Sequence, residues 1–504
     1  MAQTWLDPTF GTGGVVEEAF CQFADEAFCT VLQPDGKILV AGMAQLYIGQ
    51  QSGSDFLLTR FDVDGSLDTS FGSAGVATHE VLESNAFFDM ALQPDGKIVL
   101  VGTSRELPSL LRKRVVLRFS ADGLIDASFG TDGVLIIDVD WGEVGLSGVA
   151  VQVDGRIVVT GYGGFANEQT FYVARLNNDG SFDATFAGGE GQFEHSIGGT
   201  NYSGEVVIMS DGRIVAAGGC TIWHPLAPPT IAGVIIRYQA DGTLDPSFGD
   251  DGVALVEGID YASALAVQTD DKVVVTGVDC NSCNTQWART ARVLPDGSLD
   301  SGFGIDGVVT HRSGINPTYS SDVLLNAAGN IMVAGAYRPA TTEYYSYLVR
   351  LLDDGSLDPT FGQAGELVYT ATEKKVSIAA MALQPDGKAL LVGSRSPVSE
   401  LYHRHVFLLR YLTEPYVGIQ EAQGDAYPVI SADALGATLV SHTSGNMTYD
   451  VLDMLGRAVD SGRANVRAFE RSQITFASPL RNGTYTIVLR DGGMTRSLRF
   501  VVTR

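Results

Sequence analysis

Nine aromatic or imidazole side chains have the chemistry expected of a ligand-binding surface. They lie mostly in segments that differ between otherwise similar stretches of the chain: Trp141, His195, Trp223, His224, Trp287, Tyr344, Tyr345, His403 and His405. Exposed Trp and Tyr beside polar groups suit contact with a sugar or a peptide. The alternative is that these rings pack the loops against one another.

Three acids form a second group with a regular position. Asp89, Glu205 and Asp322 each stand seven residues before the glycine, or its equivalent, of a recurring turn. The other copies have a small residue or a cysteine there: Cys29, Gly148, Ala264 and Ala380. If this position faces a common axis, the carboxylates converge, and a cation such as calcium would relieve their repulsion. Hydrogen bonding of each acid to a neighbouring backbone is the alternative.

The cysteines suggest local disulfides rather than a metal centre. Cys21 and Cys29 are close in sequence, as are Cys280 and Cys283, and Cys220 is left over. A single Cys-x-x-Cys pair supplies only two thiols, whereas a structural zinc site needs four ligands. We therefore expect pairing within each couple if the compartment is oxidising.

Known catalytic signatures are missing from the chain. It contains no Gly-x-Ser-x-Gly, no His-Glu-x-x-His and no phosphate-binding loop. We expect a binding protein, with no catalytic residue assigned. A hydrolase or lyase acting on an extracellular polymer is the alternative, and a purely structural stalk is a third class.

Seven copies of one repeat must position these residues. The sequence LQPDGKILVAG at Leu32–Gly42 recurs with a spacing of 57 to 60 residues, and each copy closes on a glycine or its equivalent: Gly42, Gly102, Gly161, Gly218, Gly277, Gly335 and Gly393. A second motif, an Arg followed by Asp-Gly-Ser-Leu-Asp and Phe-Gly, keeps the same period. Four short strands separated by such turns are typical of a β-propeller blade. The recurring Arg and Asp are expected to form structural pairs.

The ends of the repeated region predict a closed ring. The seventh copy stops after Tyr411 without its Asp-Gly-Ser-Leu-Asp segment, and the chain begins with the missing piece, Leu6-Asp-Pro-Thr-Phe-Gly11. A strand at Gly14–Glu18 would then complete the last blade and leave no open edge. We predict an all-β fold whose first domain, residues 1–413, is a seven-bladed β-propeller closed by the N-terminal strand. These units resemble the delta-60 repeat family of large secreted bacterial proteins, a resemblance that implies architecture and no activity.

A different domain follows the repeats. Residues 414–426 have the polar, Gly- and Pro-containing composition of a linker, and residues 427–504 alternate apolar and polar residues in short runs separated by turns. This pattern predicts a small immunoglobulin-like β-sandwich.

The C-terminal domain resembles the sorting domain of proteins exported by the type IX secretion system of Gram-negative bacteria. The matching positions are Pro428, Asp453, Gly456, Arg457, Gly483 and Tyr485. The family's Pro-Asn-Pro is replaced here by Pro428-Val-Ile430. The resemblance implies a cleaved export signal, contact with the secretion machinery, and a secreted or outer cell-surface location. An adhesive immunoglobulin-like module is the alternative.

Composition excludes two kinds of partner. The 504 residues contain 33 Lys+Arg against 59 Asp+Glu, for a net charge of −26, so binding to nucleic acid is not expected. No apolar stretch reaches the roughly 18 to 20 residues of a membrane helix, and Met1–Phe10 lacks a signal-peptide pattern. From Gly418 onward arginines and acids nearly balance, so the negative charge belongs to the propeller.

Overall fold

The computed structural model describes most of the repeated region and the strands of the C-terminal region. The described residues are 5–21, 24–48, 51–79, 81–82, 84–105, 111–137, 142–165, 168–197, 201–224, 227–280, 286–314, 318–338, 344–371, 374–397, 403–413, 429–432, 436–440, 445–453, 458–466, 471–475, 483–491 and 494–502. They divide between two compact units, Met1–Pro415 and Tyr416–Arg504. They include a 3₁₀ turn at Ala187–Gly189, and none of their helical segments is long and apolar enough to span a bilayer.

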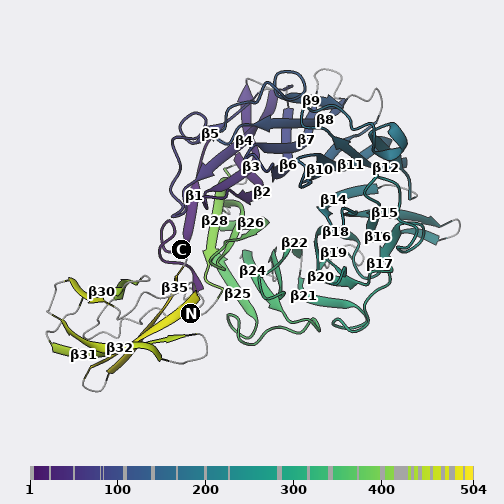
Figure 1. Ribbon diagram of the computed structural model, residues 1–504. Helices are drawn as coiled ribbons and strands as arrows, with labels where there is room; N and C mark the ends of the chain where they lie inside the picture. The colour runs from purple at the N-terminus through teal and green to yellow at the C-terminus, as the bar shows by residue number, and fades with distance from the viewer. Residues whose placement is uncertain are drawn as a thin grey trace. The chain divides into compact units, whose positions relative to one another are not determined.

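The first unit is a ring of seven four-stranded antiparallel blades, and a parallel bridge between Ser54 and Ser84 joins blades 1 and 2 in one sheet. Figure 1 shows the ring. Blades 1 to 3 are β2 (Ala24–Leu32), β3 (Ile38–Ile48), β4 (Gln51–Phe61) and β5 (Val76–Ala77); β6 (Ser84–Leu92), β7 (Ile98–Arg105), β8 (Arg112–Phe119) and β9 (Val134–Ile137); and β10 (Gly145–Val151), β11 (Ile157–Phe165), β12 (Glu168–Leu176) and β13 (Gln192–His195). Blades 4 and 5 are β14 (Asn201–Ile208), β15 (Ile214–His224), β16 (Ala227–Tyr238) and β17 (Val253–Val256); and β18 (Tyr261–Val267), β19 (Val273–Asp279), β20 (Gln286–Val293) and β21 (Val308–Gly314). Blades 6 and 7 are β22 (Thr318–Leu325), β23 (Ile331–Tyr337), β24 (Tyr344–Leu351) and β25 (Glu366–Ala371); and β26 (Lys374–Leu383), β27 (Ala389–Pro397), β28 (His405–Tyr411) and β1 (Val15–Glu18). The predicted all-β, seven-bladed propeller is confirmed.

The N-terminal segment closes the ring as predicted. Strand β1 pairs antiparallel with β28, so the fourth strand of blade 7 comes from the start of the chain. Leu6 also bridges Tyr411, and the Asp7 backbone N–H donates to the Arg410 carbonyl over 2.9 Å. Closure removes the unpaired edges that an open sheet would leave.

A β-bulge in every first strand explains the recurring closing glycine. The pairing register shifts in all seven first strands, for example between Phe87 and Asp89, opposite Gly102. A Cβ atom at Gly102 would lie 2.0 Å from the Ala86 carbonyl oxygen, so only glycine fits. A bulge changes the direction of the side chains beside it. In blade 2 the residue that follows the bulge is Asp89, one of the three acids predicted to face a common axis.

The apolar core lies between blades rather than within one. Leu39 and Leu58 of blade 1 pack in one cluster with Ile98 and Val115 of blade 2. Phe56 and Phe87 stack across the same boundary with ring centroids 3.6 Å apart. A single sheet cannot cover both of its faces, so each blade depends on its two neighbours for burial.

Strands of the second unit form two sheets. One has the order β29 (Val429–Ala432), β30 (Gly436–Val440), β33 (Arg471–Thr475). The other has the order β32 (Ala458–Val466), β31 (Gly445–Asp453), β34 (Gly483–Asp491), β35 (Met494–Val502). An immunoglobulin-like packing of the two sheets stays a prediction.

Candidate functional site

The face of the propeller that carries the repeated turns is occupied by a structural network. The Arg237 Nε donates to Asp245 Oδ2 over 2.7 Å, its Nη1 donates to the Pro295 carbonyl of the next blade over 2.7 Å, and its guanidinium lies over Phe248. Seven equivalent ion pairs, one for each blade, are present: Arg60–Asp68, Arg118–Asp126, Arg175–Asp183, Arg237–Asp245, Arg292–Asp300, Arg350–Asp358 and Arg410–Asp7. The predicted structural role of the recurring Arg and Asp is confirmed.

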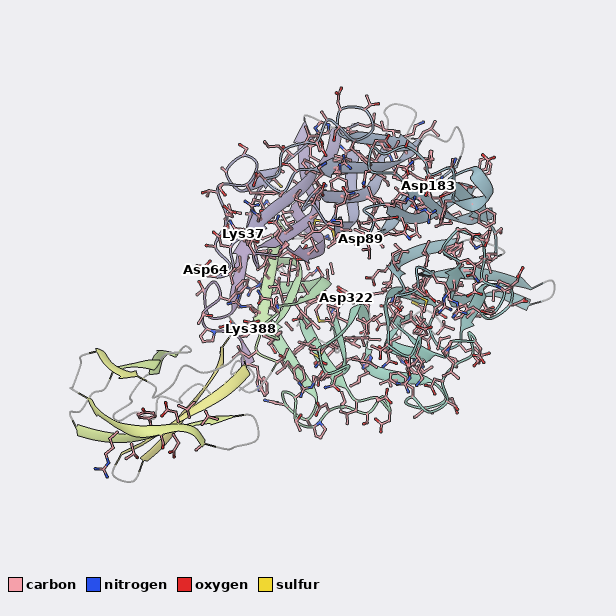
Figure 2. The ribbon with its side chains drawn as sticks, viewed as in Figure 1. Lys37, Asp64, Asp89, Asp183, Asp322 and Lys388 are labelled. Carbon is pink, nitrogen blue, oxygen red and sulfur yellow. The ribbon has the colours of Figure 1, made fainter. Side chains whose placement is uncertain are left out.

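Basic residues of the first turn join this network. Lys37 Nζ lies 2.6 Å from Asp68 Oδ2, so the first and third connections of a blade share one face. Burial opposes ionisation of Asp68, but hydrogen bonds from Lys37, Ser70 and Arg60 outweigh it and lower its pKa. Figure 2 shows Lys37 and Asp183 farther from the channel than Asp89 and Asp322. The described Arg and Asp side chains of the repeated turns are thus occupied by one another.

The three acids predicted to line the channel each bind the next blade. Asp89 Oδ2 accepts the Val149 N–H over 2.8 Å, Glu205 Oε2 accepts the Leu265 N–H over 2.9 Å, and Asp322 Oδ2 accepts the Met381 N–H over 2.6 Å. The alternative that each acid bonds to a neighbouring backbone is therefore the one observed. The donors directly follow Gly148, Ala264 and Ala380, which explains why small residues alternate with the acids.

Crowding at the channel changes the titration of these acids. Burial raises the pKa of Asp89 to about 7, and the charge of Asp322 adds to the effect. Burial likewise raises the pKa of Asp322 to about 7, and it raises that of Glu205, to which the charges of Asp322 and Asp89 contribute. As whole residues, all three are half-buried. Within the described part of the chain, no three His, Cys, Asp or Glu side chains are grouped closely enough to hold a metal, so calcium stays a prediction.

Several predicted ligand residues instead pack within the propeller. The His195 ring stacks on Phe193 at 5.3 Å and meets the Tyr238 ring of blade 4 at 5.8 Å. Both of its nitrogens are buried without a hydrogen-bond partner, and burial lowers its pKa to about 4. Trp287 is half-buried with the Arg289 guanidinium 4.4 Å from its ring centroid. The His195 and Trp287 rings therefore pack against neighbouring side chains, which is the alternative to ligand binding.

Other predicted ligand residues and one predicted disulfide cysteine lie wholly or partly outside the part of the chain that the structure describes. Trp141 lies outside the described residues, and Trp223 and His224 end β15 with side chains that are not described. No disulfide joins Cys21 to Cys29, and Cys280 carries a free thiol, so neither expected pairing is formed. Cys283 itself lies outside the described residues.

A cavity of about 250 Å³ lies between blades 6 and 7, on the face opposite the repeated turns, which we call the variable face. Strand starts and ends at this face supply its lining: Tyr319 and Tyr344 from blade 6, and Lys375, Val376, Ser377, Ser394, Arg395, Ser396 and Arg404 from blade 7. Only one of these residues, Tyr344, was expected to bind a ligand. Tyr345 lies beside it, stacked on Tyr337 at 5.1 Å.

The surroundings of this cavity, which we call the blade 6–7 pocket, are rich in cations. The Glu17 carboxylate of β1 lies 2.9 Å from Lys374 Nζ, 3.0 Å from Arg395 Nη1 and 3.1 Å from His405 Nδ1. Arg404 pairs with Glu26 of blade 1, and His403 beside it is exposed. His405 therefore contacts Glu17 and is not part of the cavity lining.

Sequence reasoning missed most of the pocket because its residues are scattered. Tyr319 and Arg395 are 76 positions apart in the chain, and neither belongs to a repeated motif. The one available signal was local positive charge in an acidic chain, at Lys374-Lys375 and at His403-Arg-His405. Which of the seven blades carried the site could not be read from that signal alone.

Those residues of the sorting-domain resemblance that the structure describes lie on adjacent strands. Asp453 ends β31 and pairs with Tyr485 of β34, whose Gly483 pairs with Val502 of the last strand. Pro428, Gly456 and Arg457 lie outside the described residues.

Three solved structures that are similar to this chain have low sequence identity to it and TM-scores below 0.5. A virginiamycin B lyase from Staphylococcus aureus is 9% identical over 78% of this chain and 98% of that chain, with a TM-score of 0.41. The polysaccharide lyase Uly1 is 11% identical over 81% and 92%, with a TM-score of 0.43. The β-propeller domain of the Trilobed protease from Pyrococcus furiosus is 10% identical over 80% and 99%, with a TM-score of 0.43. Identities this low carry no activity over to this chain.

Sequence comparison identifies the repeats themselves. None of the curated proteins matches the chain. The family described as a domain of unknown function (DUF5122) beta-propeller matches six segments, residues 33–71, 93–129, 152–186, 230–248, 268–303 and 329–361. In these six segments the chain is thus similar to the DUF5122 β-propeller family, and its seven-bladed ring agrees with that description.

Proposed function

We propose that this chain is a secreted or cell-surface bacterial protein whose propeller binds a glycan on its variable face. The observation that carries the proposal is the blade 6–7 pocket, an open cavity lined by aromatic, hydroxyl and cationic side chains. Such a mixture of one apolar wall and convergent polar groups is typical of ligand sites. The resemblance of the units to delta-60 repeats of secreted proteins agrees with an extracellular role. A peptide or a partner protein is the other ligand to be tested.

Tyr344→Ala is expected to weaken glycan binding about five- to tenfold, because the ring forms the aromatic wall of the pocket. The measurement is a glycan-array screen of the full chain, followed by titration of the best ligand. Trp287→Ala is the matched control, since that ring packs under Arg289 in blade 5. Loss of binding in Trp287→Ala with none in Tyr344→Ala would place the site elsewhere.

The enzyme alternative uses the same pocket. Burial raises the pKa of Tyr319 to about 12, so its phenol is protonated at neutral pH and could serve only as a proton donor. Multiple-turnover cleavage of a bound polymer, lost on Tyr319→Phe, would favour the enzyme over the binding protein.

The C-terminal unit is proposed to direct type IX secretion, with the secretion machinery as its partner. Its support is the resemblance of residues 427–504 to sorting domains, with Asp453, Gly483 and Tyr485 on adjacent strands.

Deleting residues 427–504 is expected to leave nearly all of the protein inside the cell, in a host with this secretion system and with an export signal supplied. The measurement is the fraction found in the medium or on the surface. As a control, residues 414–504 fused to an unrelated periplasmic protein should carry it out. Normal export of the truncated chain would leave the adhesive-module alternative.

A further inference from the structure

Among the described residues, more cations than acids lie around the blade 6–7 pocket. Lys374, Lys375, Arg395 and Arg404 lie at this end of blades 6 and 7, and the described acids that accept ion pairs from them are Glu17 and Glu26. The nearby Asp25 directs its Oδ2 to the backbone N–H groups of Phe20 and Cys21 instead. From these contacts we propose that the pocket binds the carboxylate of an acidic sugar. This assignment rests on the proposed glycan-binding function and names its ligand class.

Lys375 is the first group available to such a carboxylate. Within the described part of the chain it has no acid at ion-pair distance, and its Nζ lies 5.5 Å from the centre of the Tyr344 ring. The neighbouring Lys374 already binds Glu17. An ammonium group that lines a cavity and lacks a counter-ion attracts an anion into that cavity.

Arg395 is the second available group. Within the described residues its guanidinium donates one hydrogen bond, from Nη1 to Glu17 Oε2 over 3.0 Å, although it has five N–H donors, of which the one on Nε is buried. Its plane is held over Phe407, with 5.3 Å between the guanidinium carbon and the ring centre. A guanidinium fixed in this way can donate its remaining Nη hydrogens to a carboxylate in the cavity.

The rest of the lining favours a sugar over an acidic peptide. The lining includes the hydroxyl-bearing residues Tyr319, Ser377, Ser394 and Ser396 and the aromatic residue Tyr344, and the Ser394 hydroxyl also accepts the Ala27 N–H. Hydroxyls both donate and accept, as sugar hydroxyls do, and an aromatic face suits the apolar face of a pyranose. A volume of about 250 Å³ is below that of pockets for drug-sized ligands and suits one sugar unit of a chain.

The net charge of −26 does not prevent this binding. At physiological salt the field of a charge falls off over about 8 Å, so distant acids are screened from the pocket. Many acids of the repeated turns are also paired with Arg or Lys on the opposite face.

The test is calorimetric titration of the full chain with three probes: tetragalacturonate, its fully methyl-esterified form, and a tetraglutamate peptide. Tetragalacturonate is expected to bind best, with an affinity that falls as salt rises, and the ester is expected to bind about tenfold more weakly. Lys375→Gln is expected to remove about tenfold of the tetragalacturonate affinity and to leave binding of the ester unchanged. Lys272→Gln, which removes the same charge from the opposite face where Lys272 pairs with Asp270, should change neither.

Each other result has a separate meaning. Equal binding of the acid and its ester, or an unchanged affinity in Lys375→Gln, would overturn the acidic-sugar assignment and leave a neutral glycan site standing. Preference for tetraglutamate would overturn it in favour of an acidic peptide. Absence of binding to any probe here, together with an empty glycan array, would remove the proposed function itself.

Discussion

Asp7→Ala is expected to lower the free energy of unfolding by about 3–5 kcal/mol, because it leaves a buried arginine without its counter-ion. Asp7 and Arg410 are 2% and 3% exposed, and Arg410 Nε lies 2.9 Å from Asp7 Oδ2. Asp7 also accepts the backbone N–H and the hydroxyl of Thr9, so the turn before β1 weakens as well. The measurement is equilibrium unfolding in denaturant.

Two controls separate ring closure from the loss of an ion pair. Asp245→Ala breaks the equivalent pair in the middle of the ring, with 2.7 Å between Arg237 Nε and Asp245 Oδ2, and should cost a similar free energy. Only Asp7→Ala should also expose the N-terminal segment to limited proteolysis, because Asp7 joins the two ends of the propeller. Asp64→Ala removes an exposed turn aspartate and should change stability little. Resistance of Asp7→Ala to both denaturant and protease would contradict the proposed role of this pair in closure.

Glu205→Gln is expected to stabilise the propeller relative to the wild type, by an amount that grows with pH over the window that begins near the ordinary pKa of a glutamate, about 4.3. Burial and the charges of Asp322 and Asp89 raise the pKa of Glu205 in the folded state. The folded state therefore holds a proton that the unfolded state has lost, and stability falls as the pH rises through this window. Glutamine keeps the acceptor for the Leu265 N–H and removes the charge.

The comparison must be made as a difference between variant and wild type. Burial lowers the pKa of His195 to about 4 and that of His311 to about 3, so these groups reduce stability as the pH falls below about 6.5 and oppose the acids. Subtracting the wild-type curve removes their contribution. Glu190→Gln, an exposed glutamate of blade 3, is the matched control and should give parallel curves. Parallel curves for Glu205→Gln would show that the channel acids do not repel one another.

The same pair of proteins tests the calcium prediction. If a cation relieves the repulsion among Asp89, Glu205 and Asp322, millimolar calcium should raise the melting temperature of the wild type near neutral pH and have less effect on Glu205→Gln. Equal shifts in both proteins would place calcium elsewhere.

Repetition made the propeller predictable from the sequence. The bulge requires the closing glycines, because a Cβ at Gly102 would contact the Ala86 carbonyl. Each recurring Arg can be buried because its partner Asp neutralises its charge. Because local constraints of this kind recur in phase, seven weak signals reinforce one another. The split repeat at the two ends then identified β1 as the closing strand.

The candidate site could not be predicted in the same way. His195 and Trp287 have the residue types of a binding surface, but their neighbours, Tyr238 and Arg289, turn them into packing residues. Tyr319 and Arg395 gave no signal, because neither lies in a motif.

The sequence by itself determined the number of blades, the closure of the ring, the structural role of the Arg and Asp pairs and the acidic character of the propeller, since each depends on local backbone geometry or composition repeated along the chain. Only the tertiary structure decided that the channel acids bind the next blade and that a cationic pocket opens between blades 6 and 7. Those features depend on contacts between residues about 60 or more positions apart, and the sequence does not encode such contacts in any local pattern.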